Sequence, residues 1–173
     1  MPLVTCSGCG TQVEIPTSRK YDGVVACKGC RQKISVTIAN GEVVKSAPAI
    51  DRELLEGLTT PPIPADLYAD YEDAVRCLGC GVPRAAAVMC RYTVQHALLA
   101  RGAADGPPDK MVNAARQRGL LSEKAFRMCS TAVFIGGKGA HPQEQPADEV
   151  TNDDAKNSIL ATKTVLRELF TEG

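Results

Sequence analysis

Hydrophobic positions recur at helical spacing through most of the chain after residue 65, and the longest such run is Pro83–Ala100. This run is apolar on almost every side, which is typical of a helix buried at the centre of a bundle. Its polar residues Arg84, Arg91 and Gln95 fall within about 40° of one another at 100° per residue. We therefore predict a central helix that shows one narrow polar stripe and buries its other faces.

Four further helices are predicted from the same spacing, and no strand pattern follows residue 46. Their expected N-terminal capping residues are Asp66, Asp109, Ser122 and Thr151. We expect Gly136 and Gly137 to end the helix that follows Ser122, and a glycine-rich turn to continue to Pro142. Together with the central helix, these segments predict an antiparallel helical bundle.

The first 45 residues follow a different pattern, in which short β-type runs replace the helical spacing. The runs cover residues 12–15, 23–27, 34–38 and 42–45, with a hairpin signal at Asn40–Gly41 before the last. Prolines mark the next segment as a linker, which a short helix at residues 51–57 interrupts. The predicted organisation is a β module at 1–45, a linker at 46–64 and a helical bundle at 65–173.

Four cysteines give the β module its most specific signal. Cys6–Cys9 and Cys27–Cys30 are two C-x2-C pairs, and their spacing matches that of a four-cysteine zinc site. Two cysteines on one tight turn place both sulfurs on the same side of a tetrahedral ion, and a glycine inside each pair permits the turn. The module therefore resembles a zinc ribbon with one structural zinc. Because so small a module buries little core, the metal should supply much of its folding free energy.

The other four cysteines, Cys77, Cys80, Cys90 and Cys129, leave two interpretations open. Cys77 and Cys80 have the spacing of metal ligands. Cys90 and Cys129 occupy apolar helical positions, where cysteine packs as a small hydrophobic residue. A second metal site is the less favoured of the two.

Composition limits the setting of the protein. The formal net charge is zero, so no overall field draws the chain to nucleic acid or membrane. No apolar run approaches the roughly 18 residues of a membrane span, and the first residues lack the pattern of a secretory signal. We therefore expect a cytoplasmic protein whose eight cysteines are kept reduced.

Basic residues gather in the β module, where residues 1–47 hold six Lys or Arg against three acids. Five of them are candidate phosphate contacts: Arg19, Lys20, Lys28, Arg31 and Lys33. The same residues also suit an ordinary solvated surface. The module thus has either a nucleic-acid or a protein partner.

Three segments of the helical part together resemble a known family. They are PIPADLYADYEDAVRCL, RAAAVMCRYTVQHALL and FIGGKGAHP, followed by a final amphipathic helix. In order and spacing they resemble, over about residues 61–171, an uncharacterised prokaryotic domain of unknown function related to the HEPN superfamily of helical bundles. That domain is often found fused to restriction-endonuclease subunits. The resemblance implies a HEPN-like bundle that commonly dimerises, in nucleic-acid metabolism or phage defence.

The resemblance also implies a candidate chemistry. Catalytic HEPN proteins are metal-independent ribonucleases that pair an arginine with a histidine a few residues later at the dimer interface. In the family pattern, the arginine stands near the start of a segment that ends in Gly-Asn-x-x-Ala-His. Here the histidine is His141, but the arginine position is occupied by Val133 and the asparagine of that segment is replaced by Gly137. These departures favour a protein that is not an enzyme.

A ribonuclease would also need a cation beside His141. Either Arg91 or Lys138 would steady a phosphate while His141 acts as general acid or base. Arg91 and His96 have an R-x4-H spacing, but five helical residues turn their side chains about 140° apart. The segment GGKGAH lacks the full phosphate-loop pattern and follows a helix, so we reject that motif.

The sequence therefore predicts a mainly α protein: a HEPN-like antiparallel helical bundle preceded by a small β zinc ribbon. Its predicted function is a non-catalytic binding module, dimeric through the bundle, in a nucleic-acid, phage-defence or counter-defence setting. The first alternative is a ribonuclease that uses His141. The second is a regulator that binds a host protein.

Overall fold

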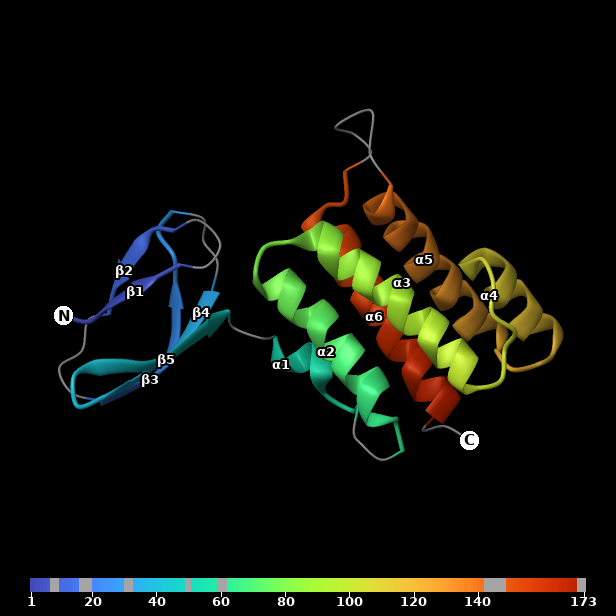
Figure 1. Cartoon of the computed structure of the whole chain (residues 1–173), viewed down its shortest axis with the longest axis horizontal. Coiled ribbons are helices and arrows are strands. Elements are labelled where there is room, and N and C mark those ends of the chain that lie inside the picture. Colours follow the sequence, from blue (N-terminus) through green and yellow to red (C-terminus); the bar gives the residue numbers. More distant parts are fainter. Residues whose placement is uncertain are drawn as a thin grey trace. The chain divides into compact units, whose positions relative to one another are not determined.

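The computed structural model describes residues 1–6, 10–15, 20–29, 33–48, 51–58, 62–141 and 149–170, without the side chains of residues 45–48. The chain divides into two compact units: the first is Met1–Asp51 with Gly79–Gly81, and the second is Arg52–Leu78 with Val82–Gly173 (Figure 1). The protein is mainly helical with a small N-terminal β region, as the sequence predicts.

The first unit contains two antiparallel sheets. The smaller sheet pairs β1 (Leu3–Thr5) with β2 (Gln12–Glu14). The larger sheet has the order β3 (Lys20–Ala26), β4 (Lys33–Ala39) and β5 (Glu42–Pro48). Strand β1 was not predicted, although the equally short β2 was.

The hairpin between β4 and β5 turns at the predicted residues. Asn40 has φ 54° and Gly41 has φ 84°, both in the left-handed region that a two-residue turn of this kind requires. Strand β4 alternates along its length, and its Ile34, Val36 and Ile38 point into the core of the unit. This core is small, with eight fully buried residues among those described.

The second unit is built from helices alone in its described residues. They are α1 (Arg52–Leu55), α2 (Ala65–Gly79), α3 (Pro83–Ala100), α4 (Pro108–Gln117), α5 (Glu123–Ala140) and α6 (Asn152–Phe170). Two predicted caps are confirmed. The Ser122 hydroxyl accepts from the Ala125 N–H, and the Asp154 N–H donates to the Thr151 hydroxyl.

Helices α3, α5 and α6 pack against one another to form the centre of the unit (Figure 1). Arg84, at the start of α3, bonds to the end of α5, so these two helices run antiparallel. Ser122, before α5, bonds to Glu168 near the end of α6, so α5 and α6 are antiparallel as well. The central position predicted for Pro83–Ala100 is therefore confirmed.

The prediction that Gly136 and Gly137 end a helix is wrong, because α5 continues to Ala140. Gly136 and Gly139 lie on the face of α5 that packs on α3. A Cβ at Gly136 would stand 2.4 Å from the Arg91 Cβ and 2.7 Å from the Ala87 carbonyl oxygen. These glycines therefore allow two helices to approach closely, and the contacts made there outweigh the poor helix propensity of glycine.

The prediction that α3 shows only a narrow polar stripe is also wrong. Arg84 and Arg91 lie against α5, whereas Tyr92 and Leu99 are 52% and 40% exposed. An apolar sequence marks the helix as central but does not say which of its faces the neighbours cover. No helix among the described residues is long and apolar enough to cross a membrane.

Candidate functional site

The first cysteine of the predicted zinc site lies at the end of β1. Cys6 is buried, its N–H donates to the Thr11 carbonyl at 2.9 Å, and its carbonyl accepts from the Gly10 N–H at 2.9 Å. Gly10 has φ 74°, which turns the chain back into β2. Cys9, the second cysteine of this pair, lies outside the described residues.

The second pair begins directly after β3. Cys27 is 1% exposed, and its sulfur accepts a hydrogen bond from the Gly29 N–H at 3.3 Å. Backbone N–H groups that point at a cysteine sulfur stabilise its thiolate form, which is the form that binds a metal. Cys30 lies outside the described residues.

Cys6 and Cys27 belong to one cluster of buried residues, so the fold brings a cysteine of each pair into the same core. The described residues contain no group of three or more His, Cys, Asp or Glu side chains that could hold a metal. Since two of the four expected ligands are outside those residues, the zinc site stays a prediction.

The other four cysteines, all described, do not come together as a metal-binding group. Cys90 and Cys129 are fully buried in the bundle. Burial raises the pKa of the Cys90 thiol to about 11, partly offset by the Thr162 and Ser158 hydroxyls. Burial, with the charge of Glu168, raises the pKa of Cys129 to about 12. Both thiols are therefore protonated and unreactive at neutral pH, as expected for core residues.

The predicted basic residues of the first unit separate into two groups. Lys33 pairs with Ala26 in the β3–β4 ladder, so it lies at the same end of the sheet as Lys28 and the Cys27 turn. Lys20 lies at the opposite end of β3. All three are exposed, whereas Arg19 and Arg31 lie outside the described residues.

His141 is the residue after the last turn of α5. Its N–H donates to the Gly137 carbonyl at 3.3 Å, and its own carbonyl accepts from Arg84 Nη2 at 3.2 Å. Arg84 Nε also donates to the Gly139 carbonyl at 2.6 Å. Arg84 therefore donates to carbonyl groups at the end of α5 that lack helical partners, and its positive charge offsets the negative end of the helix dipole. No local pattern indicates this role, because 55 residues separate Arg84 from Gly139.

The two cations proposed to assist His141 do not share a face of α5. The stem of Arg91 lies against Gly136, on the side of α5 that contacts α3. Lys138 is about 160° round the helix from Gly136, at 100° per residue. Its charge helps to lower the pKa of Asp154, after the stronger effect of hydrogen bonds from Thr151. The fold thus directs Arg91 and Lys138 to different neighbours.

Sequence reasoning missed a polar cluster around His96. Its Nδ1 lies 2.8 Å from Asp70 Oδ2, and its Nε2 lies 3.4 Å from Asp66 Oδ2. Both carboxylates come from α2, where they are one turn apart on the same face. Tyr92 lies beside the imidazole, with ring centroids 6.0 Å apart. The i,i+4 spacing of the two aspartates is the sequence signal that could have indicated this contact between α2 and α3.

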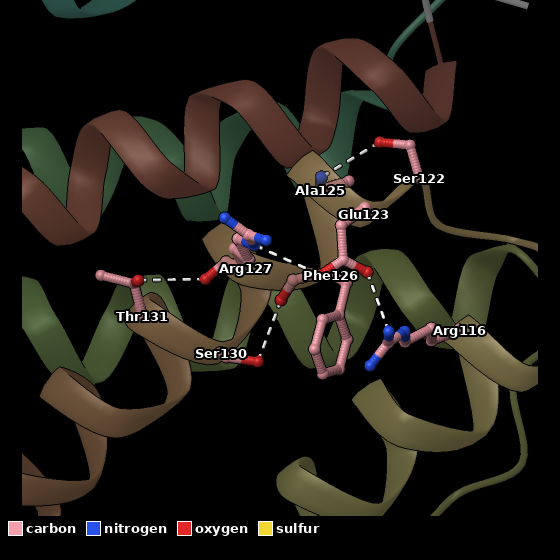
Figure 2. A network of polar contacts seen from close by, with 8 residues as sticks. All are labelled: Arg116, Ser122, Glu123, Ala125, Phe126, Arg127, Ser130 and Thr131. Atoms are coloured by element: carbon pink, nitrogen blue, oxygen red, sulfur yellow. Dashed lines mark hydrogen bonds and ion pairs between the residues drawn. The ribbon is translucent and has the colours of Figure 1, made fainter.

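A second polar network surrounds the start of α5 (Figure 2). Glu123 accepts from Arg116 at 2.9 Å and from Arg127 at 3.2 Å. The Arg116 guanidinium also lies over the Phe126 ring, 4.3 Å from its centroid. These contacts tie α4 to α5. The side chains of both ion pairs are about half exposed or more, so each pair contributes little to stability.

Comparison with known proteins assigns the helical unit to a family. A family model described as "Domain of unknown function (DUF4145)" matches residues 72–172. The chain belongs to the DUF4145 family. The DUF4145 match begins within α2, continues to the end of α6, and does not include the β-strands. No curated protein and no solved structure matches the chain significantly.

Proposed function

We propose that this protein is a non-catalytic binding module in which a zinc ribbon recognises a partner and a HEPN-like helical bundle supplies dimerisation. The proposed setting is nucleic-acid metabolism, phage defence or counter-defence, in the cytoplasm. The partner of the ribbon is a nucleic acid in this proposal, with Lys28 and Lys33 as phosphate contacts near the Cys27 turn.

The observation that carries the proposal is the pair of buried sulfurs in the first unit. Cys6 and Cys27 each end a strand, share one core cluster, and belong to two separate C-x2-C pairs. The Gly29 N–H directed at the Cys27 sulfur supports a thiolate there. A module with eight buried core residues gains little free energy from packing, which supports a structural role for the metal.

Metal analysis of the purified protein tests this directly. We expect one zinc per chain in the wild type, none in Cys27→Ser, and one in Cys129→Ser, whose cysteine is buried in the bundle. Retention of zinc by Cys27→Ser, or its absence from the wild type, would contradict the proposal.

The alternative function is a ribonuclease with His141 as general acid or base. It would need Arg91 or Lys138 as the phosphate cation, because Arg84 is bound to the Gly139 and His141 carbonyls. We expect no RNA cleavage in metal-free buffer by the wild type or by His141→Ala. Cleavage by the wild type that is lost in His141→Ala would replace the binding module with an enzyme. If the ribbon binds no nucleic acid, the second alternative, a regulator of a host protein, becomes the better account.

A further inference from the structure

A pocket of about 170 Å³ opens between α5 and α6 at the surface of the helical unit. Its lining residues are Lys124, Leu160, Lys163, Thr164, Arg167 and Glu168. The α6 residues recur at i, i+3, i+4 and i+7 from Leu160, so they form one face of that helix. Lys124 reaches the same place from the first turn of α5, because α5 and α6 run antiparallel.

Three cations and one carboxylate surround this pocket. Both oxygens of Glu168 are bound to Ser122, one to its N–H and one to its hydroxyl, each at 2.8 Å. The carboxylate is therefore directed at the start of α5, and the pocket keeps an excess of positive charge. The contrast with α2 is clear, since that helix carries Asp66, Asp70, Glu72 and Asp73 against Arg76.

One of the three cations is already fixed in position. Lys163 Nζ donates to the carbonyl of Glu53 in α1 at 2.8 Å, which restricts the ammonium. An ammonium has three N–H donors, so two more can meet a ligand. Arg167 adds a planar guanidinium of the kind that binds phosphate through two parallel hydrogen bonds.

We infer that this pocket binds a phosphate group. Its lining has no aromatic side chain that could stack on a base, so it would contact the backbone of a nucleic acid without reading sequence. The nucleic-acid source of the phosphate rests on the proposed function, whereas the pocket itself does not. A small phosphate compound is the other source of the same chemistry.

The test compares two doubly substituted full-length proteins with the wild type. Lys124→Gln with Arg167→Gln removes two charges from the pocket, and Arg76→Gln with Lys110→Gln removes two charges from α2 and α4. Binding of a fluorescent single-stranded oligothymidine is measured by anisotropy over a range of salt concentrations. We expect the pocket variant to bind about tenfold more weakly, with a salt dependence of log K smaller by about 1.4. The control variant should bind within about twofold of the wild type.

The second arm uses inorganic phosphate alone, followed by amide chemical shifts in the NMR spectrum. Phosphate should shift amides near Lys163 and Thr164 in the wild type but not in the pocket variant.

Equal oligonucleotide binding by both variants would overturn the phosphate site and leave the ribbon as the binding element. If the wild type binds no oligonucleotide, the proposed function fails, and phosphate shifts that need Lys124 and Arg167 would still support the pocket. If phosphate causes no shifts either, the pocket inference is wrong as well. Thermal unfolding of all three proteins checks that they are folded.

Discussion

Each of the two units of this protein is stabilised internally, but by different means. In the first unit, two small sheets enclose eight fully buried residues, two of which are cysteines of the predicted zinc site. In the second, three long helices pack closely enough that glycine is required where α5 meets α3. The comparison teaches that close packing can stabilise a unit of the size of the bundle, whereas a small sheet module buries little core, which is why we propose a structural metal there.

The largest effect should follow from removing the metal. Cys27→Ser, or chelation of the wild type, should unfold the first unit, because the proposed structural zinc would supply much of its folding free energy. The bundle should stay helical. Limited proteolysis should therefore cut within residues 1–51 while circular dichroism keeps its helical signal. Unchanged protease resistance of the first unit in Cys27→Ser would count against a structural zinc.

A second change should affect only the bundle. Gly136→Ala places a Cβ 2.7 Å from the Ala87 carbonyl oxygen, which α3 can relieve only by moving. We expect a loss of about 1–3 kcal/mol in the free energy of unfolding. The matched control is Gly137→Ala, whose Cβ would stand 3.6 Å from Arg91 Nη1, an ordinary contact.

Gly137→Ala should be neutral or stabilise the bundle by up to about 1 kcal/mol, because alanine favours the helix over glycine. Chemical unfolding of both variants, followed by circular dichroism, gives the comparison. Equal effects of the two substitutions would show that close packing at Gly136 is unimportant.

The smallest expected effect concerns the start of α6. Hydrogen bonds from the Thr151 N–H and hydroxyl lower the pKa of Asp154 below its usual 3.8. The stabilisation is thus present above that pH and is lost as the pH falls through the lowered pKa of the folded state. Asp154 is only partly buried, so solvent screening limits the contribution to about 0.5 kcal/mol. Asp154→Asn should reduce the fall in bundle stability between neutral and acidic pH, and an unchanged fall would contradict this assignment.

Much of this architecture follows from local patterns in the sequence. The apolar run Pro83–Ala100 matches α3 at both ends, and the hairpin at Asn40–Gly41 forms where the residue types require it. The predicted end of α5 at Gly136 and Gly137 is wrong, because Gly136 and Gly139 pack against α3 within a continuous helix. Their partners, Arg91 and Arg84, are distant in sequence, and only tertiary contact reveals why glycine is tolerated there.

The site residues likewise divide into those that a local motif predicts and those that only tertiary contact brings together. The cysteine pairs are local motifs, and the structure adds only that Cys6 and Cys27 share one core. The contact of His96 with two aspartates, and that of Arg84 with the end of α5, join residues far apart in the chain. Such contacts depend on which helix faces meet, and a single sequence does not specify that.

X-ray absorption at the zinc edge of the purified full-length protein tests the central claim most directly. The predicted spectrum shows four sulfur ligands at about 2.3 Å, supplied by Cys6, Cys9, Cys27 and Cys30. Substitution of Cys27 by serine should abolish the four-sulfur signal. Zinc bound mainly by nitrogen or oxygen, or no bound zinc, would contradict the account of the first unit.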